Sequence, residues 1–262
     1  EWYRRAAENG SEPAKQKLQL LGGDQNAGYA EDPRLSSLSD DELRREIQVD
    51  YDGARAQRNK TKDSEAYLRA NVSRLGLWRE GADRDLPQAQ SLMALCYHYG
   101  VGVERDLAKK GALLQKAAAR NDPVAVFNLA TSYLTGEGMP RDMEKSKEYY
   151  LKAIELGDPR AMWQVALRQL RGGTMFSKDV RSAETLLVRS AEQGNMQAME
   201  ALGDLYLGST EEIPVDPAKA EEWYRRAADL GFESAQRKLQ GLRPMGTDET
   251  RRDGATASPT SE

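Results

Sequence analysis

Residues 123–134 read PVAVFNLATSYL, and this stretch decides the fold. Ala125, Leu129 and Tyr133 are spaced four residues apart, so they would lie along one face of an α-helix. Pro123 suits the first turn of such a helix, because the N–H that proline lacks would have no partner there. Glycines follow soon after the stretch and suit the end of a helix. The stretch therefore predicts a helix with one apolar face.

A second helix is predicted directly after the first. Asp142 is placed to cap its N-terminus, because a carboxylate can accept the free N–H groups of the first turn. The segment then carries Tyr150 and Ala153 at helical spacing, and Gly157 closes it. Small residues such as alanine let two helices approach to about 8–10 Å. The two segments together predict a helical hairpin.

This hairpin recurs along the chain at intervals of 36 or 37 residues. Three sets of residues follow the same spacing: Ala89, Ala125, Ala161, Ala198 and Ala235; Asp106, Asp142, Asp179 and Asp216; and Ala118, Ile154, Ala191 and Ala228. Three registers that advance together indicate a true repeat. The sequence therefore predicts an all-α protein, an α-solenoid of stacked antiparallel helix pairs.

The motifs within each repeat resemble those of the Sel-1-like repeat family, which is related to the tetratricopeptide repeats. The fourth repeat carries the family pattern at Ala198, Leu202-Gly203, Tyr206, Asp216, Ala220, Trp223-Tyr224, Ala227-Ala228 and Gly231. The third repeat departs from it, with Gln169 in place of the tyrosine and Met175-Phe176 in place of the Gly-Val turn. The fourth also lacks the glycine turn at 209–212. These departures leave the turn geometry open, and the resemblance extends over about 86–242.

The resemblance implies a right-handed superhelix that acts as a scaffold or adaptor for protein complexes. Cysteine-rich members of the family have been linked to cell-wall-type ligands through paired cysteines. Cys96 is the single cysteine here, so the sequence gives no positive sign of that role.

Four segments are predicted along the chain. Residues 1–21 nearly duplicate 222–242, so we interpret them as the remnant of an upstream repeat, or else as a helix that packs elsewhere on this chain. Residues 22–63 are expected to be a linker plus a charged helix. Residues 64–243 are expected to be the repeat array, with a degenerate half repeat, four full repeats and a terminal half repeat. Residues 244–262 lack large apolar side chains after Met245 and are predicted to be disordered.

The charged helix has its own start signal and a narrow apolar stripe. Ser39 and Glu42 form a capping-box pattern, which predicts that a helix begins there. Leu43, Ile47 and Tyr51 fall on one stripe of that helix. The stripe is wide enough to dock the helix on another surface but too small to form a domain.

The composition gives no indication of catalysis, a cofactor or a metal. His98 is the only histidine, and a metal site needs three or four suitable ligands. The net charge of −4 and the pI near 5.4 argue against nucleic-acid binding. No apolar run approaches the roughly 18 residues of a membrane span. The sequence predicts a non-enzymatic protein with a protein or peptide partner, and its single cysteine favours a reducing compartment such as the cytoplasm.

A candidate binding surface follows from helix geometry. In the first helix of each repeat, side chains two, six and ten residues after the recurring alanine point away from the core. In a two-helix solenoid that side forms the concave face. The predicted protein-binding residues there are Leu95, Tyr99, Phe127, Thr131, Trp163, Leu167 and Arg171. Two alternatives stay open: that adjacent repeats bury these side chains, and that the array regulates an enzyme domain upstream of residue 1.

Overall fold

The computed structural model describes residues 34–61, 64–208 and 210–242. Those ranges contain helices and no β-strand, which confirms the all-α prediction. The predicted repeat remnant at 1–21 and the predicted disordered tail at 244–262 lie outside the described residues. The helices are α3 (Asp40–Thr61), α4 (Glu65–Ala70), α5 (Leu75–Asp83), α6 (Pro87–Tyr99), α7 (Leu107–Ala119), α8 (Pro123–Thr135), α9 (Met143–Glu155), α10 (Pro159–Arg171), α11 (Val180–Glu192), α12 (Met196–Leu207), α13 (Pro217–Asp229) and α14 (Glu233–Leu242), with short 3-10 turns at Leu35–Ser37 and Val72–Arg74.

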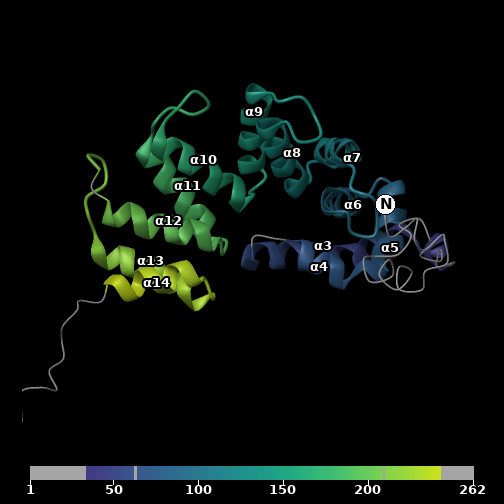
Figure 1. Cartoon of the computed structure of the whole chain (residues 1–262), viewed down its shortest axis with the longest axis horizontal. Coiled ribbons are helices and arrows are strands. Elements are labelled where there is room, and N and C mark those ends of the chain that lie inside the picture. Colours follow the sequence, from purple (N-terminus) through teal and green to yellow (C-terminus); the bar gives the residue numbers. More distant parts are fainter. Residues whose placement is uncertain (1–33, 62–63, 209, 243–262) are drawn as a thin grey trace, which may run out of the picture.

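The helices from α5 onward pack in pairs that form an arc. Helix α6 packs on α7, α8 on α9, α10 on α11 and α12 on α13, and each pair packs on the next. Figure 1 shows the arc from α5 round to α14. This arrangement confirms the predicted α-solenoid. None of the described helices has the length and apolar character needed to cross a membrane.

Side-chain caps fix where the helices begin. The four repeating aspartates each accept a backbone N–H of the first turn of a second helix, at 2.9–3.0 Å: Asp106, Asp142, Asp179 and Asp216. Asp122, Asp158 and Asn195 cap α8, α10 and α12 in the same way. These bonds satisfy N–H groups that a helix leaves without partners. The recurring Asp and Asn residues therefore mark the repeat boundaries.

The recurring alanines lie where two helices cross. All five of them, Ala89, Ala125, Ala161, Ala198 and Ala235, are fully buried. Gly203 lies against the next helix, because a Cβ atom there would lie 2.4 Å from the ring of Tyr224. Small residues at these positions bring the backbones together and leave room for the large side chains beside them.

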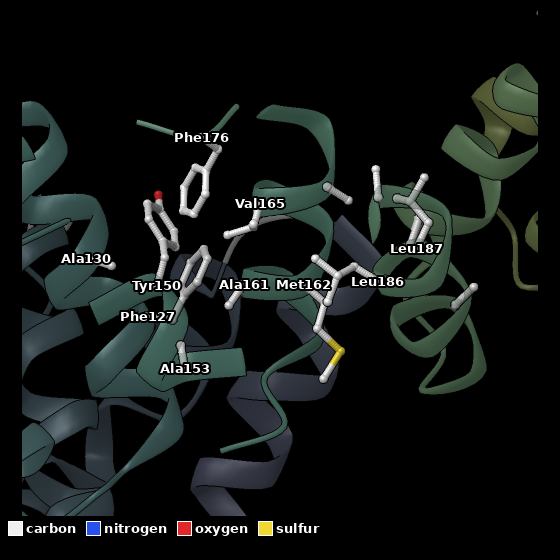
Figure 2. Close-up of a cluster of buried hydrophobic side chains, with 14 of the residues drawn as sticks. Phe127, Ala130, Tyr150, Ala153, Ala161, Met162, Val165, Phe176, Leu186 and Leu187 are labelled. Atoms are coloured by element: carbon white, nitrogen blue, oxygen red, sulfur yellow. The ribbon is translucent and has the colours of Figure 1, made fainter. Parts of the chain in front are cut away.

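The turns that depart from the family pattern keep its buried apolar residue. Val103 in the first repeat, Phe176 in the third and Ile213 in the fourth hold the same register and are all buried. Figure 2 shows Phe176 beside Tyr150 and Val165, in a group that includes Phe127. The turns whose geometry the sequence did not predict thus differ in residue type, but each still packs one apolar side chain against the core.

Candidate protein-binding face

Helix α3 crosses the inside of the arc (Figure 1). It packs on α4, α5 and α6 through one stripe of side chains. Leu43, Ile47 and Tyr51, the stripe seen in the sequence, are at most 6% exposed, and Asp50 and Ala54 are buried beside them. We use the name inner face for the side of α6, α8, α10 and α12 that carries Leu95, Thr131, Leu167 and Asp204. The charged helix therefore covers the first part of the inner face.

The buried carboxylate of Asp50 holds α3 against the start of the array. It accepts a hydrogen bond from the Trp78 indole N–H at 2.8 Å and one from Arg74 Nε at 2.6 Å. The hydroxyl of Tyr67 donates to it at 3.2 Å. A buried carboxylate is costly unless its oxygens are bonded, and here three donors satisfy them. Asp50 thus fixes the orientation of α3 on α4 and α5.

A second buried carboxylate joins α3 to the cap of α8. The Tyr51 hydroxyl donates to Asp122 Oδ2 at 2.7 Å, and the Ser91 hydroxyl donates to Oδ1 at 2.7 Å. Burial raises the pKa of Asp122, and the hydrogen bonds from Ser91 and Tyr51 partly oppose that rise. Burial, followed by the charge of Asp122, also raises the pKa of Tyr51. One side chain therefore serves both as a helix cap and as the anchor for a helix 71 residues away in sequence.

The last turns of α3 reach α8 through Arg58. Its Nη1 donates to Asn128 Oδ1 at 3.2 Å, and its guanidinium lies 5.8 Å from the centre of the Phe127 ring. Arg160, at the start of α10, lies over the same ring at 4.3 Å. Phe127 also meets Tyr150 edge to face, with ring centres 5.9 Å apart. Phe127 is therefore enclosed by two arginines and one aromatic ring.

The structure separates the seven predicted binding residues into two groups. Leu95 and Phe127 are buried, at 9% and 6% exposure, on the part of the inner face that α3 covers. The remaining five are Tyr99, Thr131, Trp163 and Leu167, which are half-buried, and Arg171, which is exposed. Leu95 and Phe127 are therefore closed to a partner while α3 is in place. Leu95 belongs to the buried cluster that includes the α3 stripe, a contact that the sequence did not locate. Arg160 comes from the next repeat, so its contact with Phe127 agrees with the alternative that adjacent repeats bury these side chains.

The open part of the inner face runs over α10, α12 and α14. Trp163 and Leu167 lie on α10, and Trp163 packs partly against the core. On α12, Glu200 and Asp204 both bind the ammonium of Lys238 from α14, at 3.1 and 2.6 Å. This part of the face thus offers an apolar strip beside a network of charges.

A small polar hollow of about 90 Å³ lies at the end of α3, between α6, α7 and α8. Glu137 accepts a hydrogen bond from Lys110 Nζ at 2.8 Å and lies 3.2 Å from His98 Nδ1. Burial raises the pKa of Glu137, but the hydrogen bond and charge of Lys110, together with the charges of His98 and Arg105, lower it, so the net shift is downward. Burial and then the charge of Lys110 lower the pKa of His98, which favours the neutral imidazole near pH 7. These groups form a local charge network.

The single cysteine has the character of a core residue. Cys96 is fully buried, and desolvation raises its pKa to about 12. A thiol with such a pKa is almost wholly protonated at neutral pH and is a poor nucleophile. In the part of the chain that the structure describes, no three His, Cys, Asp or Glu side chains gather to hold a metal ion.

Comparison with known families agrees with this architecture. The model of the Sel1 repeat matches residues 1–11, 87–122, 123–158, 159–195 and 197–232, which is more than half of the chain. The chain belongs to the Sel1 repeat family. Sel1 repeats generally mediate protein–protein interactions, and their fold is a non-catalytic helical scaffold. No curated protein sequence matches this Sel1 repeat chain.

Solved structures with the same fold come from several bacteria. A Sel1 repeat protein from Oxalobacter formigenes has a TM-score of 0.65 and 24% identity, over 96% of this chain and 93% of that one. A protective antigen from uropathogenic Escherichia coli, which displays an SLR fold, has a TM-score of 0.57 and 26% identity; the match covers 95% of this chain but 52% of the antigen. An immunity protein from Pseudomonas aeruginosa has a TM-score of 0.51 and 20% identity, over 72% of this chain and 68% of that one.

Proposed function

We propose that this Sel1 repeat chain is a protein-binding scaffold that holds an amphipathic helix of a partner on the open part of its inner face. The observation that carries the proposal is α3 itself. This helix lies on the first part of the same face, with its three stripe residues and the neighbouring Asp50 and Ala54 buried. Helical grooves commonly bind amphipathic helices, and α10 and α12 continue this face beyond the part that α3 covers.

The open surface supplies the chemistry for such a partner. Trp163 and Leu167 lie one helical turn apart on α10, so they can receive an apolar stripe. Arg171 continues the same line into solvent, and α12 presents Glu200 and Asp204 beside it. An aromatic and a leucine at the centre with charges at the rim is the usual arrangement of a protein interface. The partner would carry apolar residues on one side and charges of both signs at its edges.

Site-specific photocrosslinking tests the location of the partner. A benzophenone amino acid is introduced at Leu167 in one protein and at Leu151, an exposed position on α9, in a control. After irradiation in cells that produce the full-length protein, the position at Leu167 is expected to give a discrete adduct that the control does not give. Equal adducts from both positions, or none from Leu167, would count against binding on this face.

A double variant tests whether the apolar strip supplies the affinity. We expect Trp163→Ala with Leu167→Ala to weaken binding of the crosslinked partner by at least about 30-fold, since a central aromatic anchor contributes about 2 kcal/mol or more. Leu151→Ala should change it less than about twofold. Circular dichroism confirms that both variants fold. Undiminished binding by the folded double variant would refute the assignment.

A further inference from the structure

A second hollow lies on the opposite side of α6 from the inner face. It has a volume of about 290 Å³, close to the lower end of the roughly 300–1,000 Å³ of small-molecule sites. Met93, Tyr97 and Leu113 line it, together with residues of α5 and α7. Successive helix residues are rotated by about 100°, so Tyr97 and Leu95 lie on roughly opposite sides of α6. The hollow is therefore separate from the face proposed above for the partner helix.

In the second repeat, an aromatic ring occupies the space that corresponds to this hollow. Tyr133 is the counterpart of Tyr97 one repeat later, 36 residues on, and Tyr149 is the counterpart of Leu113 at the same spacing. Tyr149 stacks on Tyr133 with ring centres 5.6 Å apart and an angle of 13° between the rings. Tyr133 is 9% exposed, while Tyr97 is only half-buried. The first repeat has a leucine where the second has a ring.

A lysine contact is common to the two tyrosines. Lys109 lies 5.4 Å from the centre of the Tyr97 ring, and Lys145 lies 5.4 Å from the centre of the Tyr133 ring. The two repeats therefore present one binding geometry for an aromatic ring, which the chain fills internally in the second repeat and leaves open in the first.

The charges round the hollow indicate what would flank such a ring. Arg79, Lys109 and Lys116 line it with one acidic residue, Asp83, so that the lining carries a net charge of +2. Lys109 also lies 3.6 Å from the carboxylate of Asp106 at its own helix cap. The lining is therefore positive although the chain as a whole has a net charge of −4.

We propose that this hollow binds an aromatic side chain of a partner protein that is flanked by acidic residues. The ring stacks on Tyr97 as Tyr149 stacks on Tyr133, and the acidic neighbours meet Arg79 and Lys116. Offset-stacked aromatic pairs and oppositely charged rims both favour such a contact. The site gives the scaffold a second surface, on the other side of α6 from the first.

A labelled peptide tests the proposal directly. The probe is carboxyfluorescein-Gly-Asp-Glu-Tyr-Glu-Asp, and its binding to the full chain is followed by fluorescence anisotropy at low salt. We expect saturable binding that weakens with added salt, as exposed charge pairs are screened. Replacement of the tyrosine by alanine, or of the four acids by lysine, should weaken binding at least about tenfold. Absence of saturation up to millimolar protein would overturn the proposal.

The decisive variant fills the hollow from within. Leu113→Tyr restores the ring found at Tyr149, so it should weaken peptide binding at least about tenfold and leave the thermal midpoint unchanged or higher. Leu151→Tyr, the same exchange at an exposed site on α9, should leave binding unchanged. Equal binding by wild type and folded Leu113→Tyr would overturn the proposal. Should Leu113→Tyr fail to fold, Lys116→Glu is the second test, because Lys116 is exposed. This variant should weaken peptide binding, and undiminished binding would overturn the proposal.

Discussion

The stability of the inner-face helix can be tested at Ile47. This side chain is 1% exposed. Its Cδ1 atom packs so close to Gly81 that a Cβ atom added to this glycine would lie only 2.3 Å from it. The side chain therefore sits directly over the α5 backbone. Ile47→Ala removes three carbon atoms from a buried cluster that includes Leu86 and Ala89, beside the α5 backbone at Gly81.

The expected cost follows from that geometry. Truncation of a buried isoleucine to alanine costs about 2–5 kcal/mol, and more where the cavity stays open. We expect about 3 kcal/mol here, which corresponds to a decrease of roughly 6–12 °C in the thermal midpoint of a domain of this size. Each repeat contacts mainly its neighbours, so the loss should fall on the part of the array from α3 to α8.

Urea denaturation followed by circular dichroism measures the change. Val49→Ala is the matched control, because Val49 lies two residues away on the same helix and is 68% exposed. It should change the free energy of unfolding by less than about 0.5 kcal/mol. If Ile47→Ala cost no more than Val49→Ala, the docking of α3 on α5 and α6 would be wrong.

Three further predictions follow from single contacts. Tyr51→Phe removes one donor from the buried Asp122 carboxylate and should cost about 1.5–3 kcal/mol in urea denaturation; a change below about 0.5 kcal/mol would speak against this bond. Cys96, with a pKa raised to about 12, should react with a disulfide reagent at pH 8 only when the chain unfolds, so rapid labelling of the native protein would show that the thiol is accessible. Gly203→Ala places a Cβ atom 2.4 Å from the Tyr224 ring and should destabilise α12 on α13 by about 1–3 kcal/mol, measured as a lower thermal midpoint; an unchanged midpoint would indicate looser packing.

The repeat array could be predicted from the sequence because its signals are local and recur. The buried alanines, the capping aspartates and the apolar stripes each depend on spacing within one hairpin. Even the departures at Met175-Phe176 changed little, since Phe176 keeps the register of Val103 and supplies the same buried contact. A repeat protein therefore specifies the stacking of its helices by repeating the same caps, small residues and apolar stripe in each hairpin.

The inner face could be predicted only in part. Helix geometry indicated which positions point away from the core, and the stripe at Leu43, Ile47 and Tyr51 indicated that the charged helix would dock. The sequence pattern did not predict the surface on which this helix docks, because the hydrogen bond between Tyr51 and Asp122 joins residues 71 apart in the sequence. An amphipathic stripe defines a face of a helix but not the surface that receives it. Leu95 is buried in the cluster that this docking completes, whereas Phe127 is covered mainly by Tyr150 and Arg160.

Hydrogen exchange over α3 tests the central claim most directly. If this helix is part of the folded array, backbone amides between Ile47 and Ala54 should be as strongly protected as those in α6, and should exchange only when the first repeats unfold. Protection should fall in Ile47→Ala and stay unchanged in Val49→Ala. Exchange of these amides at the rate of an isolated helix, with α6 still protected, would mean that the inner face is uncovered.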